Sequence, residues 1–241
     1  GWIGCAFICG AIEWRPHLWI TGPKGCGKST LDGLVCGILG DLALHIQGST
    51  TEAGLRQSLN GDSRPILFDE FEADGKHADA VIDTARSAAS NNAAPVVKGT
   101  PEGNPVYYKL QFAAMFSGII ANAKRDADRS RIVFLEMHRV ARDEDQRQRL
   151  IDNRERFRVD FGSGLLRRML DTLTSGKFDA ALSIFKHAIR LAGGDERKAD
   201  VFSHLLAAHH VLTSDADINP SGAKELVALV MEMDEGEPSD E

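Results

Sequence analysis

Cysteine is scarce in this sequence, and all four cysteines lie within the first 36 residues. Cys5 and Cys9 are spaced by one helical turn, but a zinc site needs two further ligands, and none follows at a comparable spacing. We therefore expect buried free thiols and no metal bound by cysteine. Free thiols are typical of a reducing compartment, so the sequence favours a cytoplasmic location.

Long apolar runs are also missing. No run reaches the roughly 18 residues that a membrane-spanning helix needs. The apolar stretch at residues 1–12 (GWIGCAFICGAI) is shorter than this and lacks the basic leader of a signal peptide. We expect this stretch to form a buried helix, and we expect no membrane partner.

Positive charge is in deficit, because the formal net charge is −7. Residues 232–241 hold six acidic side chains and no basic one, so removing these six charges from −7 leaves −1 for the rest of the chain. We predict that this acidic tail is disordered. The nearly neutral remainder restricts any contact with nucleic acid to a few loops.

The sequence does contain a glycine-rich motif, which lies between an apolar strand at residues 17–21 and a helix. The segment reads GPKGCGKST and matches G-x-x-x-x-G-K-S. Its glycines allow backbone N–H groups to turn toward phosphate oxygens, and the helix that follows adds the positive end of its dipole. Lys28 is expected to reach the β- and γ-phosphates, and the Ser29 hydroxyl to bind Mg²⁺. The predicted ATP-binding residues are Gly22, Gly25, Cys26, Gly27, Lys28, Ser29 and Thr30.

A second motif follows about forty residues later, where the apolar run RPILFDE ends in two carboxylates. A parallel strand buried on both faces has this pattern, and ligands bind at the carboxyl ends of such strands. We predict that Asp69 holds Mg²⁺ through water and that Glu70 is the general base for the attacking water. Alone, the same pattern also fits a strand that ends in solvated acids. Between the two motifs, residues 42–47 are expected to form a strand, and Ser49 with Glu52 is expected to cap a helix through Leu59.

Polar residues at a third apolar strand, at residues 113–120, complete the expected hydrolytic site. Asn122 follows this strand and is our candidate for orienting the water and sensing the γ-phosphate, although an asparagine there also suits a turn. An arginine-rich loop precedes the next strand, at residues 132–137. In ring ATPases this position supplies an arginine that reaches a neighbour's site, so Arg131, or alternatively Arg129, is the candidate.

Between the acidic strand and the third strand lies an insertion. Residues 78–89 have helical periodicity, and two β-rich pieces within residues 95–110 flank a Gly/Pro/Asn turn. In a ring ATPase a hairpin at this point projects into the channel, where Lys98 would contact phosphates and Thr100 or Asn104 would add hydrogen bonds. One of two adjacent tyrosines could stack on a base while the other faces the core. A surface hairpin with no ligand is the alternative.

Taken in order, GPKGCGKST, ILFDE, VVKGTPEGNPVYYKLQF and FSGIIANAKRDADRSRI resemble superfamily 3 helicases, and in particular the helicase domain of phage and prophage primase–helicase proteins. The resemblance covers residues 14–137. Two departures are visible: Ala123 and Lys124 follow Asn122 where members often carry an acidic residue and proline, and Ser130 separates Arg129 from Arg131.

The resemblance implies an α/β, AAA+-like P-loop NTPase core with a parallel sheet flanked by helices. It also implies ATP and Mg²⁺ as cofactors, a homo-hexameric ring, and single-stranded or forked DNA as the partner. A primase domain on the N-terminal side and a phage or bacterial-host cytoplasmic origin belong to the same expectation. The C-terminal part has helical spacing, with about five helices expected.

We therefore predict an ATPase core at residues 1–140, a helical lid or partner subdomain at residues 141–231, and the acidic tail at residues 232–241. The leading function is an ATP-dependent DNA helicase or translocase. Two alternatives remain open: a ring ATPase that acts on protein or as a nucleotide switch, and a non-enzymatic nucleotide-binding scaffold. Stimulation of ATP hydrolysis by single-stranded DNA would separate the helicase from the protein-directed ring ATPase.

Overall fold

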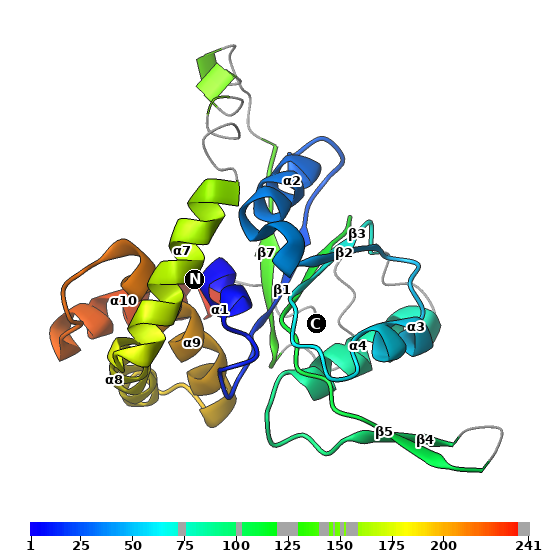
Figure 1. Cartoon of the computed structure of the whole chain (residues 1–241). Coiled ribbons are helices and arrows are strands. Elements are labelled where there is room, and N and C mark those ends of the chain that lie inside the picture. Colours follow the sequence, from blue (N-terminus) through cyan, green and yellow to red (C-terminus); the bar gives the residue numbers. More distant parts are fainter. Residues whose placement is uncertain are drawn as a thin grey trace.

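A computed structural model describes residues 1–71, 76–99, 103–119, 130–139, 145–146, 148–149, 152 and 159–235. The first half of the chain alternates strands with helices, and the described C-terminal part is helical (Figure 1). In chain order the elements are α1 (Trp2–Phe7), β1 (His17–Thr21), α2 (Lys28–Leu39), the 3₁₀ helix η1 (Gly40–Leu42), β2 (Leu44–Gln47), α3 (Glu52–Ser58), β3 (Ile66–Asp69), α4 (Lys76–Ala88), β4 (Val96–Gly99), β5 (Pro105–Tyr108), β6 (Ala114–Ser117), β7 (Ile132–Glu136), α7 (Val159–Thr174), α8 (Lys177–Leu191), α9 (Glu196–Thr213) and α10 (Pro220–Glu235).

Five strands form one parallel sheet in the order β2-β3-β6-β1-β7, and β4 pairs with β5 in a separate antiparallel hairpin. Because all neighbouring strands in this sheet are parallel, the carboxyl ends of all five strands lie along one side, called here the carboxyl edge of the sheet. This is the α/β architecture of P-loop NTPase-like proteins, and it confirms the fold class predicted from the motif order.

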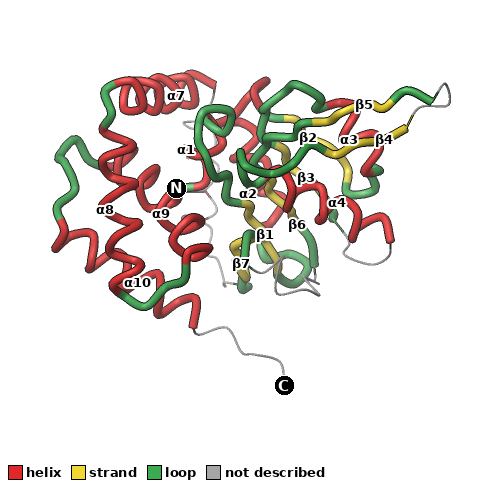
Figure 2. The backbone as a smooth tube through the Cα atoms, turned by 90° about the horizontal axis from the view of Figure 1, so that it is seen from below, coloured by secondary structure: helices red, strands yellow, loops and turns green. Residues whose placement is uncertain are grey.

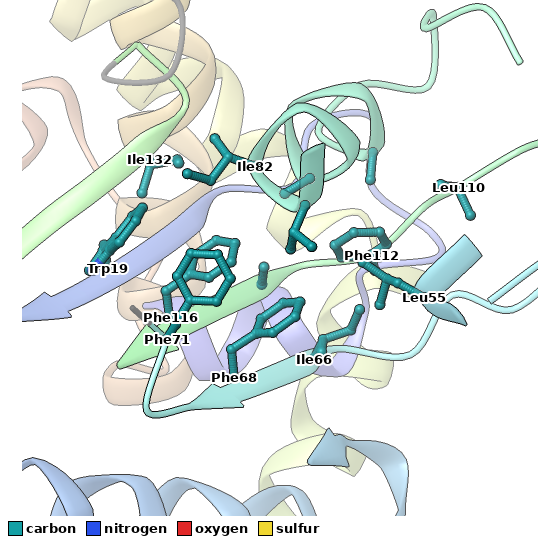
Figure 3. Packing of buried hydrophobic residues seen from close by; sticks show 14 of the residues in the cluster. Trp19, Leu55, Ile66, Phe68, Phe71, Ile82, Leu110, Phe112, Phe116 and Ile132 are labelled. Carbon is teal, nitrogen blue, oxygen red and sulfur yellow. The ribbon is translucent and has the colours of Figure 1, made fainter. Parts of the chain in front are cut away.

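The central strands are buried on both faces, as their continuous apolar runs predict. One face packs against α3 and α4 through a cluster that includes Trp19, Phe68 and Phe116. Figure 3 shows these rings packed together, and the Phe68 and Phe116 rings stack with centroids 4.8 Å apart. The alternate residues, such as Ile20 and Met115, face α1 and α2 on the other side of the sheet.

A second core is formed by the C-terminal helices together with α1. Cys5, Ile8 and Ile12 join the apolar side chains of α7, α8, α9 and α10 in one cluster. In Figure 2 these helices gather on one side of the molecule and the sheet lies on the other. The packing thus groups α1 with helices that follow it by more than 140 residues in the chain, while the domain boundary at residue 140 stays a prediction.

The two cores meet where α7 packs on α2. A Cβ atom added to Gly162 of α7 would lie 1.8 Å from the carbonyl oxygen of Ile38, near the end of α2. Only a residue without a side chain allows this approach. Helix α2, which begins at the glycine-rich loop, is therefore held directly against the helical subdomain.

Two buried polar side chains fix the start of β1. His17 is fully buried: its Nε2 lies 2.7 Å from the Ala85 carbonyl, and its Nδ1 accepts a hydrogen bond from the Ala114 N–H at 3.0 Å. Burial lowers the pKa of His17 to about 4, so the ring is neutral at pH 7. Arg15 is also fully buried, and it donates to backbone carbonyls, among them that of Ala88, and to the side-chain oxygen of Asn91.

Most predicted elements are confirmed, with shorter ends than the apolar runs suggest. The capping prediction at Ser49 is wrong, because Thr51 is the N-cap of α3 and accepts from the Gly54 N–H. The Glu52 carboxylate instead pairs with Arg56, 3.0 Å away. Four C-terminal helices lie within residues 159–235, and most of the charged segment at 143–158 is outside the described residues. Within the described ranges, no helix combines the length and apolarity needed to cross a membrane.

Candidate nucleotide-binding site

The two motifs predicted to bind ATP lie at the same edge of the sheet. Strand register pairs Ile20 of β1 with Ser117 of β6, and Phe68 of β3 with Phe116 of β6. Asp69 is therefore level with Ser117 and with the end of β1, where the glycine-rich loop begins. Neighbouring strands are separated by about 4.8 Å, so Asp69 lies roughly 10 Å from the end of β1 across the sheet. That edge is the carboxyl edge, where α/β proteins bind ligands.

The glycine-rich loop needs its glycines for conformation and for space. Gly22, Gly25 and Gly27 have φ angles of 145°, 83° and 108°, which residues other than glycine rarely adopt. A Cβ at Gly22 would also lie 2.3 Å from the Met137 carbonyl oxygen, on the segment after β7. The loop then leads into α2, which begins at Lys28 and exposes Ser29 and Thr30 in its first turn. Cys26 is buried beneath the loop.

The Lys28 ammonium lies over its own loop. It donates to the carbonyl oxygens of Gly22 and Pro23, the latter at 3.3 Å, and lies 3.8 Å from the Cys26 sulfur. A cation that is held over the loop by backbone carbonyls is close to the position where the loop N–H groups would receive phosphate oxygens.

Arg139 is a contact residue of the loop that the sequence analysis missed. Its Nε and Nη2 atoms both donate to the Lys24 carbonyl oxygen, at 3.0 and 2.6 Å. It lies in the segment after β7, which also touches Gly22. No pattern in the sequence indicates this role, because an arginine after an edge strand resembles any solvated arginine.

The acidic end of β3 has an unusual backbone. Asp69 is half-buried and Glu70 is exposed, and Glu70 has a φ of 51°. For a residue other than glycine this left-handed conformation costs of the order of 1–3 kcal/mol and tends to occur at functional sites. Hydrogen bonds hold it in place: Gly48 N–H donates to the Asp69 carbonyl and Phe71 N–H to the Ser117 carbonyl, each at 2.7 Å.

A third carboxylate, Asp32, lies behind these residues and was also missed. Asp32 is on α2, only 6% exposed, and its Oδ2 accepts a hydrogen bond from the Ser117 hydroxyl at 2.8 Å. Burial raises the pKa of Asp32, the Asp69 charge adds to this effect, and the Ser117 hydrogen bond and the Lys28 charge oppose it. Asp32 therefore lies within electrostatic reach of both predicted motifs.

Among the described residues, Arg131 lies away from this site. Arg131 precedes β7 at the opposite edge of the sheet, where its carbonyl accepts from His17 N–H and its guanidinium lies 6.0 Å from the Trp14 ring centroid. Strand β1 between His17 and Thr21 separates Arg131 from the glycine-rich loop by about 13 Å, at roughly 3.3 Å per residue. The other candidates Asn122, Arg129 and Thr100 lie outside the described residues.

The β4–β5 hairpin projects from the body of the protein (Figure 1). Lys98 is exposed and pairs with Val106, and Asn104 is exposed where β5 begins. As predicted, the two tyrosines differ: Tyr107 is 61% exposed, whereas Tyr108 is half-buried with the Arg56 guanidinium 4.7 Å from its ring centroid.

The chain can be compared with known proteins by family, by sequence and by structure. No protein-family model and no curated protein matches the chain. Among solved structures, it is similar to the JCV helicase in a crystal structure with a bound small molecule. The identity is 13% and the TM-score 0.40, and the match covers 99% of this chain and 61% of that one. This chain therefore spans less than two thirds of the length of that chain. A likeness at this level gives no information about activity, so the function proposed below depends on the site's own residues.

Proposed function

We propose that this protein binds ATP with Mg²⁺ at the carboxyl edge of the sheet and hydrolyses it. The observation that supports the proposal is the position of the two motifs: the glycine-rich loop begins where β1 ends, and Asp69, the last residue of β3, is level with that point across the sheet. A phosphate-binding loop alone suits many nucleotide-binding proteins. Two carboxylates at the same edge of the sheet favour hydrolysis, which needs a metal ligand and a base.

In this proposal each side chain has one task. Lys28 leaves the loop carbonyls and contacts the β- and γ-phosphates, and the loop N–H groups bind the remaining phosphate oxygens. Glu70 accepts the proton of the attacking water, for which its exposed position at the end of β3 is suitable. The strained backbone at Glu70 sets the direction in which its Cα–Cβ bond leaves the strand.

The residues present also fit Mg²⁺. Within the described part of the chain no three His, Cys, Asp or Glu side chains converge as ligands of one metal. Mg²⁺ in nucleotide sites is bound by one or two protein oxygens, substrate phosphates and waters, so such a cluster is not required. Ser29 through its hydroxyl and Asp69 through water would hold the ion. When bound, Mg²⁺ neutralises charge that develops on the phosphates.

We further propose that hydrolysis drives movement along DNA, as in a helicase or translocase ring. The exposed hairpin offers a cation at Lys98, a hydrogen-bonding side chain at Asn104 and an aromatic ring at Tyr107, which are the groups that single-stranded DNA contacts. Thr100, which lies outside the described residues, belongs to the same proposal. A hexamer, forked DNA and a primase domain on the N-terminal side are parts of the proposal that come from the resemblance to superfamily 3 helicases. The alternative is a ring ATPase that acts on protein.

The test is ATP hydrolysis with and without single-stranded DNA, at protein concentrations that allow rings to form. We expect DNA to stimulate hydrolysis, and we expect Lys98→Ala to remove the stimulation while leaving the unstimulated rate. Lys109→Ala is the matched control, because Lys109 is an exposed lysine just after β5 and outside the paired strands. Hydrolysis that depends on Glu70 but not on DNA would reject the DNA motor and favour the protein-directed ring.

A further inference from the structure

Asp32 has a property that the proposed roles of the other residues leave unexplained. It lies four residues after Lys28 on α2, and thus on the same face of that helix. The residue is only 6% exposed, and Oδ2 accepts a hydrogen bond from Ser117. Oδ1 is buried and has no partner among the described residues.

A structural link between α2 and β6 does not account for this carboxylate. A Ser117 hydroxyl can donate equally well to a neutral asparagine or serine, so the link needs no negative charge. A buried carboxylate oxygen without a partner is costly, because it loses hydration without replacement. Such atoms are rare in folded proteins, and each one calls for a donor.

The charges around Asp32 indicate which donor is missing. The charges of Asp69, Lys28 and His45 all act on the Asp32 carboxylate, which is therefore within electrostatic reach of the glycine-rich loop and of the acidic end of β3. Lys28 donates to the carbonyls of its own loop. Asp69 is the predicted residue for hydrated Mg²⁺. A donor that lies beside Asp69 and carries positive charge would satisfy Oδ1 and offset the negative charge of Asp32.

We propose that Asp32 is a positioning residue for hydrated Mg²⁺: Ser117 holds Oδ2, and Oδ1 accepts a hydrogen bond from a water bound to the ion. The inference rests on the ATP–Mg²⁺ function proposed above. Mg²⁺ keeps several waters in nucleotide sites, and those waters donate strongly to carboxylates. Ser117 has two roles here, because its hydroxyl orients Asp32 and its carbonyl accepts from Phe71 N–H, just after the acidic pair.

The inference is tested by binding, independently of turnover. A fluorescent ADP analogue is titrated onto the protein in EDTA and then at increasing Mg²⁺, and Mn²⁺ binding to the protein–ADP complex is followed by electron paramagnetic resonance. Asp32→Asn keeps an acceptor for Ser117 but places an amide donor at the second position. We expect the half-saturating Mg²⁺ and Mn²⁺ concentrations to rise about tenfold, as is typical when an outer partner of a metal site is lost. Affinity for the analogue in EDTA stays unchanged.

Two further variants make the result specific. Ser117→Ala removes the donor that orients Asp32, so it should raise the half-saturating metal concentration in the same direction by a smaller factor. Asp41→Asn is the matched control, because it removes an exposed carboxylate from the 3₁₀ turn that follows α2. This control should leave both metal titrations unchanged.

Each remaining outcome rejects a different statement. Unchanged metal titrations in a folded Asp32→Asn protein, or an equal loss of affinity with and without metal, would overturn the role of Asp32 and leave ATP binding intact. A wild-type protein that binds no analogue at any Mg²⁺ concentration would reject the proposed function, and this inference with it. Should Asp32→Asn fail to fold, Ser117→Ala decides, since an unchanged metal titration in that variant contradicts the inference.

Discussion

Acid should destabilise this protein through a histidine that the fold keeps neutral. His17 is fully buried at the start of β1, and both ring nitrogens are engaged with the backbone, at Ala85 and Ala114. Protonation would place a second donor against the Ala114 N–H and a charge in the core beside the buried Arg15 guanidinium. We therefore expect the free energy of unfolding to fall when the pH is lowered from 7 to 5.

The sign and size follow from the pKa. Burial lowers the pKa of His17 from 6.5 to about 4, so between these values the unfolded chain binds a proton that the folded chain does not. Stability is therefore present above pH 6.5 and falls as the pH drops toward 4. Linkage over two pH units gives a loss of about 2 kcal/mol for one such histidine. His204, whose pKa burial also lowers to about 4, adds a similar loss, for a total of about 4 kcal/mol.

The assay is urea unfolding followed by tryptophan fluorescence at pH 7, 6 and 5. In His17→Gln we expect the loss between pH 7 and pH 5 to be smaller than that of the wild type by about 2 kcal/mol, because the contribution of His17 is removed while that of His204 remains. His138→Gln is the control, since the His138 side chain is 76% exposed, and its pH dependence should equal that of the wild type. A His17→Gln protein with the full wild-type loss would refute the assignment of this acid sensitivity to His17.

Three further predictions concern the site and its support. Glu70→Gln should keep ATP binding and lower hydrolysis by about 10²–10⁴-fold, as expected for a lost general base; normal turnover in a single-turnover assay would exclude that role. Arg131→Ala, inactive alone, should regain ATPase activity when mixed with Lys28→Ala if Arg131 acts on a neighbouring copy, and no rescue at any ratio would contradict such action. Gly162→Ala should lower the free energy of unfolding by about 1–3 kcal/mol, because its Cβ would lie 1.8 Å from the Ile38 carbonyl; a wild-type urea midpoint would show that α2 and α7 can separate freely.

The sheet and its ligand edge were predictable because their signals are local in sequence. An apolar run of four or five residues that ends in glycine or in two acids identifies both a buried parallel strand and its carboxyl end. Asp69 and the loop before Lys28 could thus be assigned to one edge without knowing the strand order. The helix cap was harder, since Ser49 and Thr51 both precede Glu52 in a polar run, and only backbone geometry selects Thr51.

What could not be predicted depends on packing between distant segments. Asp32 follows the glycine-rich motif without being one of its specified positions, and its contact with Ser117, 85 residues further along the chain, appears only in the fold. Arg139 is assigned by its contact with the Lys24 carbonyl, and α1 joins the C-terminal core through Cys5 and its neighbours. No periodicity or spacing encodes these pairings, because each residue alone also suits an ordinary surface or core position.

The residues of the proposed mechanism lie at opposite ends of the parallel strands. The glycine-rich loop and Asp69 lie at the carboxyl edge, whereas Arg131 lies at the other end of the strands, with its guanidinium near Trp14. The intervening length of β1, about 13 Å, keeps Arg131 away from the loop of its own chain. An arginine at that place contributes to hydrolysis only when another copy brings its own loop to it. If Arg131 has the predicted role, the catalytic unit is therefore an interface between copies, and the rate per chain depends on assembly.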